Sequence, residues 1–160
     1  MSIDLAVALP DDASIDVSTF EAELRRNLHA LFTPPVPLFV ESAMSAWGED
    51  SWTAEIKVGP NAHVELLCHS IGTKGQFGDE AGWWILVSVA YRTDESFLLM
   101  LVVAAQLSKT LRVPILDEAA MFSNMRFLDP SRAKELLEQL TGTTFARAAG
   151  LLRQHLRKSN

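Results

Sequence analysis

The side chains best suited to chemistry fall on one predicted strand, which covers residues 62–70. They are two imidazoles, a carboxylate and a thiol, contributed by His63, His69, Glu65 and Cys68. Side chains alternate between the two faces of a strand, so His63, Glu65 and His69 share one face. The two histidines lie six positions apart, which is roughly 20 Å along an extended strand, so they cannot share one ion. We therefore expect no metal site and interpret this face as a solvent-facing polar surface.

The lone cysteine, Cys68, is the candidate sulfur nucleophile of the chain. Its position in the strand alternation matches that of Val64 and Leu66, which are expected to face the core. A thiol in apolar surroundings is inert, because burial disfavours the reactive thiolate. We therefore expect Cys68 to be a structural residue, and a chain with one cysteine cannot form an intrachain disulfide.

Two further patterns could carry catalysis, and neither is complete. Asp117 and Glu118 follow a short predicted strand, where paired carboxylates could do acid–base work or hold a cation. Nothing nearby in the sequence supplies a complementary base, and such carboxylates commonly cap the following turn. The segment Gly72-Thr73-Lys74-Gly75 lacks the G-x-x-x-x-G-K-[ST] order of a phosphate-binding loop. The sequence therefore predicts a protein that is not an enzyme and needs no cofactor.

Tryptophans and carboxylates alternate around the predicted turns, and a glycine-rich segment with glycine at 72, 75, 78 and 82 precedes the strand that starts at Trp83. Aromatic anchors with a charged rim are typical of protein interfaces, and a glycine-rich loop is a plausible contact region. The alternative is that Trp83 and Trp84 belong half to the core, because one of two adjacent strand residues must face inward, and that the loop is a long hairpin connection. The candidate partner-binding residues are Trp47, Glu49, Asp50, Lys74, Phe77, Asp79 and Glu80.

A central helix over about 94–112 must organise the elements that position these residues. From Phe97 to Ala105 every residue is apolar, and a helix that is apolar on all sides is buried by its neighbours or lies in a membrane. Nine positions are far short of the roughly 20 residues needed to cross a bilayer. Thr93 or Asp94 is expected to cap this helix, and Pro114 ends it. The sequence therefore predicts a buried core helix.

The remaining elements predict an α+β fold with a mainly antiparallel sheet. An amphipathic N-terminal helix is expected to begin at Ser18, which forms a capping-box pattern with Glu21. Two C-terminal helices are expected, one over 130–141 and one starting at Thr143 or Thr144. We expect one α+β domain over residues 1–160, with strands at 3–9, 38–42, 52–58, 62–70, 83–91 and a short extended segment at 113–116.

Charge is distributed unevenly along the chain. Residues 1–80 hold 13 acidic and four basic side chains, a net charge of −9, whereas residues 81–160 carry a net charge of +3. An acidic half disfavours nucleic acid as a partner, because phosphate binding needs clustered lysines and arginines. It suits capture of a basic protein, although net charge can also serve solubility alone. Without a signal-peptide pattern or a transmembrane stretch, we expect a cytoplasmic protein that does not bind membranes.

Part of the chain resembles a family. A strand–helix–strand pattern similar to that of small bacterial immunity proteins is formed by Val89-Ala90-Tyr91-Arg92-Thr93-Asp94-Glu95-Ser96, Ala104-Ala105-Gln106-Leu107 and Ile115-Leu116-Asp117-Glu118. Such proteins accompany secreted polymorphic or contact-dependent toxins. The resemblance implies a cytoplasmic α+β protein without a cofactor that blocks a cognate toxin by tight binding. It assigns no binding residue by position.

Three classes of function remain open at this point. The leading hypothesis is an immunity protein that occludes a toxin domain. The alternative is a secretion or assembly chaperone for an effector protein, which an exposed sheet edge or groove and a symmetric homodimer would favour. An enzyme would require His63, His69, Cys68 or Asp117 to converge in one pocket.

Overall fold

The computed structural model describes residues 4–71, 82–122 and 126–159. The protein has an α+β fold, as the sequence predicts. Its strands are β1 (Asp4–Leu9), β2 (Ile15–Asp16), β3 (Leu38–Ser42), β4 (Ala46–Trp47), β5 (Trp52–Val58), β6 (Ala62–Ile71), β7 (Gly82–Val89), β8 (Ile115–Leu116) and β9 (Phe127–Leu128). Its helices are α1 (Val17–Leu31), α2 (Asp94–Leu111), α3 (Pro130–Glu138) and α4 (Phe145–Ser159).

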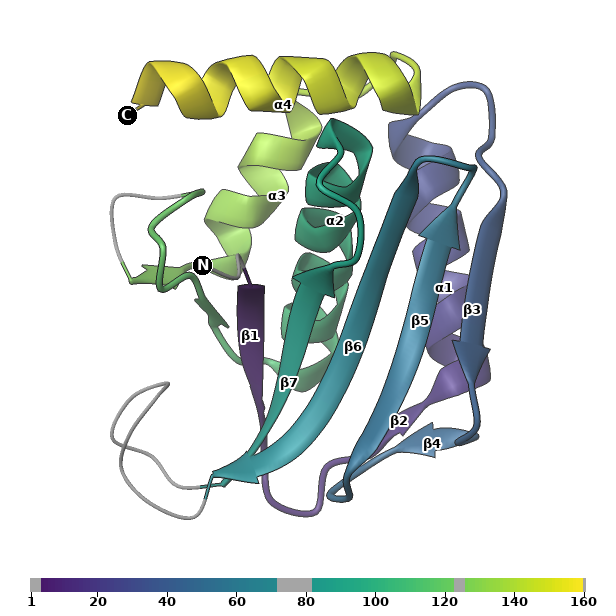
Figure 1. Ribbon diagram of the computed structural model, residues 1–160, viewed down its shortest axis with the longest axis vertical. Helices are drawn as coiled ribbons and strands as arrows, with labels where there is room; N and C mark the ends of the chain where they lie inside the picture. Colours follow the sequence, from purple (N-terminus) through teal and green to yellow (C-terminus); the bar gives the residue numbers. More distant parts are fainter. Residues whose placement is uncertain (1–3, 72–81, 123–125, 160) are drawn as a thin grey trace.

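Seven strands form one antiparallel sheet in the order β3-β5-β6-β7-β1-β8-β9. The first strand of the chain therefore lies inside the sheet, between β7 and β8. Strands β2 and β4 form a separate two-stranded sheet. Figure 1 shows α1 and α2 against one face of the large sheet, with α3 beside α2 and α4 across the top of the helices. No described helix covers the opposite face of the sheet, which we call the open face.

Burial alternates along the central strands and separates the two faces. In β5 the even-numbered residues from Trp52 to Val58 are buried, and the odd-numbered residues between them are not. Residues directly paired across a sheet share a face, so the pairing of Ile56 with Val64 carries the same division into β6. The buried set packs against the helices in the main core, while a second, small cluster of Ala6, Trp84 and Leu116 lies on the open face.

Helix α2 is the buried central helix that the apolar run predicts. Phe97 to Ala104 are all buried, and the helix packs against β1, β6 and β7 on one side and against α3 and α4 on the other. Thr93 is the N-cap: its hydroxyl accepts a hydrogen bond from the Ser96 amide at 3.1 Å. None of the described helices is long and apolar enough to cross a membrane.

The start of α1 differs from the sequence prediction. Asp16, and not Ser18, is the N-cap, and its carboxylate accepts hydrogen bonds from the amide and the hydroxyl of Thr19 at 2.9 and 2.7 Å. These bonds lower the pKa of the Asp16 carboxyl. The small sheet explains the difference, because the pairing of β2 with β4 holds the chain extended only as far as Asp16. The capping-box pattern of Ser18 and Glu21 is local and carries no information on the pairing of β2 with β4.

The C-terminal region also differs from the prediction in its boundaries. Helix α3 starts at Pro130 as predicted, with Asp129 as its N-cap, but it ends at Glu138 and not at 141. Gly142 then adopts φ +79°, a conformation that suits glycine. Its amide donates to the carbonyl of Leu31 at 3.1 Å, and the Thr33 amide donates to the carbonyl of Thr143 at 3.0 Å. Helix α3 ends early because the segment that contains Gly142 and Thr143 is hydrogen-bonded to the end of α1. Strands β2, β4 and β9 have two residues each, too few for a periodic signal.

Candidate functional site

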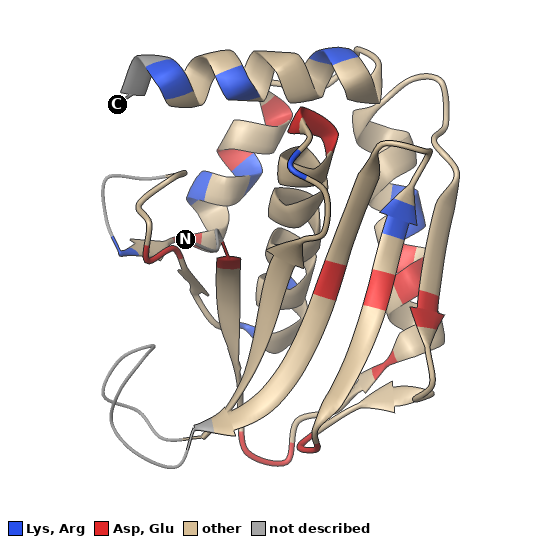
Figure 2. Cartoon of the chain, viewed as in Figure 1, with Lys and Arg blue, Asp and Glu red and all other residues tan. Residues whose placement is uncertain are grey.

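A row of glutamates crosses the open face of the sheet. Glu41 on β3 is paired with Glu55 on β5, and Glu55 is paired with Glu65 on β6. Figure 2 shows these three acidic positions at the same height on neighbouring strands. Like charges directly opposite one another destabilise a sheet. We call these three residues the glutamate row, and its electrostatic cost marks it as a site that requires positive charge.

Two side chains from the next level of the sheet lie beside this row, and one of them, Lys57, supplies positive charge. Lys57 and His63 are paired with each other across β5 and β6. The Lys57 ammonium lies 3.9 Å from Glu55 Oε2 and 4.0 Å from Glu41 Oε1. His63 Nε2 lies 3.3 Å from the other oxygen of Glu55, Oε1. The Glu55 carboxylate thus has the Lys57 ammonium beside one oxygen and the His63 imidazole beside the other.

His63 is held firmly in this position. The residue is 7 % exposed, and its ring meets that of Tyr91 edge to face, with the centroids 5.1 Å apart. Its backbone amide donates to the hydroxyl of Ser96 on α2 at 3.0 Å. The start of the buried helix therefore fixes the strand segment that carries the imidazole.

The strand register confirms that His63, Glu65 and His69 share one face. The expectation that this face is exposed to solvent is wrong for His63, which is buried. Alternation along one strand carries no information on the neighbouring strand, so the predicted set lacks Glu55 on β5. The signal was present in the sequence: a turn at 59–61 joins the two strands and sets residue 55 opposite 65 and residue 57 opposite 63.

A second acidic feature lies where two turns meet at one end of the molecule. Asp11 and Asp12 follow β1, and Glu49 and Asp50 precede β5; all four are exposed. The Asp12 amide donates to Glu49 Oε1 at 3.2 Å across a separation of 37 residues. None of these four carboxylates forms an ion pair within the described part of the chain. We call them the acidic tip. Figure 2 shows the opposite end with the basic residues of α4.

Trp47 supports the acidic tip from beneath. Its side chain is fully buried, stacks on Trp52 with the ring centroids 5.0 Å apart, and meets Phe20 edge to face at 5.1 Å. Its Nε1 donates to Ser42 Oγ at 3.0 Å. Trp47 is one of the predicted partner-binding residues, but its indole packs against Phe20 of α1 and has no exposed surface.

The other candidate partner-binding residues divide between two regions. Glu49 and Asp50 are exposed and belong to the acidic tip. Lys74, Phe77, Asp79 and Glu80 fall in the segment 72–81, outside the described residues.

Cys68 faces the core, as the strand alternation predicts. The residue is fully buried, and its Sγ donates to the carbonyl of Gly48 at 3.8 Å. Burial raises the pKa of the thiol to about 11. The thiol is therefore protonated at neutral pH and is poorly suited to nucleophilic attack.

Asp117 is a structural cap. The carboxylate is buried and accepts hydrogen bonds from the amides of Met121 and Phe122 at 3.0 and 2.8 Å. Glu118 points outward to Arg126 at 3.3 Å. The two adjacent carboxylates therefore serve different partners and do not form a catalytic pair.

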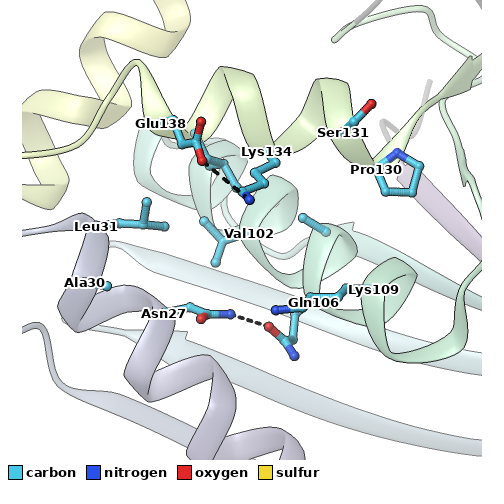
Figure 3. A pocket seen from close by; sticks show the side chains of 12 residues that line it. Asn27, Ala30, Leu31, Val102, Gln106, Lys109, Pro130, Ser131, Lys134 and Glu138 are labelled. Atoms are coloured by element: carbon cyan, nitrogen blue, oxygen red, sulfur yellow. Dashed lines mark hydrogen bonds and ion pairs between the residues drawn. The ribbon is translucent and has the colours of Figure 1, made fainter.

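A groove opens on the helical side of the molecule, between α1, α2 and α3 (Figure 3). It encloses about 410 Å³. Val102 and Ala105 of α2 and Leu31 and Leu137 of the flanking helices give it an apolar lining. Gln106, 4 % exposed, accepts a hydrogen bond from Asn27 and donates to Glu23 at 2.8 Å. These hydrogen bonds connect α1 to α2 along one side of the groove.

Comparison with known proteins finds no matching family model, no similar curated protein and no similar solved structure.

The buried thiol gives a reactivity prediction. In the native protein at pH 8, alkylation of Cys68 by iodoacetamide should be at least about tenfold slower than in urea, because burial lowers both the thiolate population and the access of the reagent.

The same thiol gives a prediction on stability against pH. The unfolded chain loses the Cys68 thiol proton near the ordinary pKa of 9.0 and the native chain only near 11. Stability should therefore fall as pH rises through that interval, and the Cys68→Ala variant should lack this component. Mass spectrometry and urea titrations at pH 8 to 10.5 measure both effects; equal alkylation rates would contradict the prediction.

The cap at Asp117 gives a stability prediction. Asp117→Ala should lower the free energy of unfolding by about 1–3 kcal/mol, because the buried amide of Phe122 loses its hydrogen-bond acceptor. The matched control, Glu118→Ala, removes an exposed ion pair and should cost less than about 1 kcal/mol. Urea unfolding followed by circular dichroism measures both. Similar losses in the two variants would show that the Asp117 carboxylate does not stabilise this turn.

Proposed function

We propose that this protein is a cytoplasmic immunity protein, which neutralises a cognate secreted toxin by covering a basic surface of that toxin. The observation that carries the proposal is the acidic tip, where four exposed carboxylates from two turns meet without a basic partner among the described residues. The resemblance of residues 89–118 to small bacterial immunity proteins adds support.

Electrostatics favour a basic protein as the partner. Exposed carboxylates of one sign raise the rate of encounter with a positively charged surface and suppress encounters with acidic ones. The same charge disfavours nucleic acid, whose phosphates require a basic surface. The tip therefore supports a partner with clustered lysines or arginines, as expected where an inhibitor covers the substrate site of a cationic toxin.

Rigidity is the second property that supports the proposal. The chain beneath Glu49 and Asp50 is anchored by the stack of Trp47 on Trp52, and Trp52 Nε1 donates to the carbonyl of Gly48 at 3.0 Å. A loop that is already ordered pays less conformational entropy on binding. The acidic tip is thus a preorganised charged surface, and the buried indoles contribute by holding it in place.

The first experiment is co-purification with the product of the neighbouring upstream gene, followed by binding kinetics. The double variant Glu49→Gln with Asp50→Asn keeps the acceptor oxygens and removes two charges. We expect its association rate to fall by about tenfold at low salt and its salt dependence to weaken, because steering is lost.

The matched control is the double variant Glu118→Gln with Glu135→Gln, which removes two exposed charges away from the tip. Its association rate should remain close to that of the unmodified protein. Equal slowing in both variants would reduce the effect to net charge, and no complex with a toxin-like neighbour would overturn the proposal.

A secretion or assembly chaperone is the second candidate, and the groove between α1, α2 and α3 favours it. An apolar channel between helices suits an amphipathic segment of an effector, whose apolar face would lie along α2. Lys109 and Lys134 at the edges of the groove would suit acidic residues on that segment.

One substitution distinguishes the two candidates. Ala105→Trp places an indole in the groove, whereas Leu151→Trp adds the same indole at an exposed position of α4. If the protein is a chaperone, only Ala105→Trp should abolish capture of the effector in a pull-down assay. If the protein is an immunity protein that binds through its acidic tip, both variants should neutralise the toxin as the unmodified protein does.

A further inference from the structure

The open face of the sheet brings together three groups that can ligate a metal. One ligand atom from each of Glu55, His63 and Glu65 lies within 4.8 Å of the other two. Each comes from a regular strand, and the pairing of β5 with β6 fixes their positions. An arrangement built on strands is more precise than one on loops.

The imidazole of His63 is the observation that points to a ligand. The residue is more than nine-tenths buried, and neither ring nitrogen makes a hydrogen bond with any described residue. The approach of Nε2 to Glu55 Oε1 at 3.3 Å does not meet hydrogen-bond geometry. Buried polar groups without partners are costly and rare. This one is aimed at a carboxylate, so a cation between them would satisfy both groups.

Lys57 does not occupy this position. Its ammonium lies on the Oε2 side of Glu55, toward Glu41, whereas His63 faces the Oε1 side. Glu65, at the other end of the row, forms no ion pair within the described residues. One lysine therefore compensates one side of the glutamate row, and the side next to His63 and Glu65 retains uncompensated negative charge.

We propose that Glu55, His63 and Glu65 bind a divalent transition-metal ion, with Zn²⁺ as the best match. Zinc accepts imidazole nitrogen and carboxylate oxygen at roughly 2.0–2.2 Å in tetrahedral geometry, which sets its ligand atoms roughly 3.4 Å apart. Rotation of the exposed Glu65 side chain and the half-exposed Glu55 side chain closes the remaining gap. Calcium and magnesium suit the site poorly, because they prefer six or more oxygen ligands.

Three protein ligands leave one tetrahedral position open toward solvent, because none of the described helices lies above the open face (Figure 1). When no other molecule is bound to the ion, a water molecule fills such a position. The ion would also relieve the repulsion between Glu55 and Glu65, which face each other directly. The site thus couples metal binding to the stability of the β5–β6 pair.

The test is isothermal titration of ZnCl₂ into the purified full chain after treatment with EDTA. We expect one ion per chain and a rise in the melting temperature. Glu65→Gln, an exposed substitution that leaves the core intact, should weaken binding at least about tenfold, as should His63→Gln, since even the loss of an outer-shell partner costs this much. Circular dichroism of each variant establishes that it is folded.

The matched control is His69→Gln on the same strand and the same face, six positions from His63. It should bind zinc as the unmodified chain does. Substitution of Co²⁺ provides a second readout, a tetrahedral absorption spectrum that Glu65→Gln should remove. No binding by the unmodified chain, binding unaffected by Glu65→Gln, or binding abolished by His69→Gln would each overturn the proposal. The titration uses no partner protein, so its outcome is independent of the toxin-binding proposal.

Discussion

The register between β5 and β6 is the constraint on which the other features of the protein depend. The even-numbered residues of β5 from Trp52 to Val58 and of β6 from Ala62 to Cys68 lie in the core, and a slip of one residue would turn them to the open face. Core packing therefore enforces the register, and the register in turn sets Glu55 against Glu65. The burial of Ile56 and Val64 thus maintains a pair of like charges on the other face, at a cost that the hydrophobic core easily exceeds.

Helix α2 reinforces this register through polar contacts at its first turn. Thr93 donates from its hydroxyl to the carbonyl of Asn61 at 2.5 Å, in the turn between the two strands, and Ser96 accepts from the His63 amide. The helix cap and the hairpin turn are therefore one hydrogen-bonded unit. Tyr91 precedes this unit and packs on the His63 ring. The segment that leads into the buried helix thereby shapes the polar site on the other side of the sheet.

Local patterns were sufficient to predict much of this fold. The run from Phe97 to Ala105 identified the buried helix, and alternation along 52–58 identified a half-buried strand, because each signal spans several periods. The burial of Trp47 could not be found in this way, since a two-residue strand has no period. The acidic tip depends on two turns 37 residues apart, which only tertiary structure brings together. The glutamate row could be predicted only in part. The hairpin turn at 59–61 already implies the pairing of Glu55 with Glu65, whereas the pairing of Glu41 with Glu55 has no such local signal.

The uneven distribution of charge between the two ends gives the molecule an electric dipole (Figure 2). The carboxylates at the tip below β5 have no basic partner among the described residues, whereas Arg147, Arg153 and Arg157 lie on α4 at the opposite end, where Asp94 offsets the charge of Arg153 (Figure 2). In the electric field of a charged partner such a molecule experiences a torque as well as a net force. It therefore becomes oriented relative to the partner before the two surfaces make contact. Rotational search is then confined to a cone around the field direction. Salt shortens the range over which this torque acts to roughly 8 Å at physiological ionic strength, so prealignment operates only in the last stage of approach.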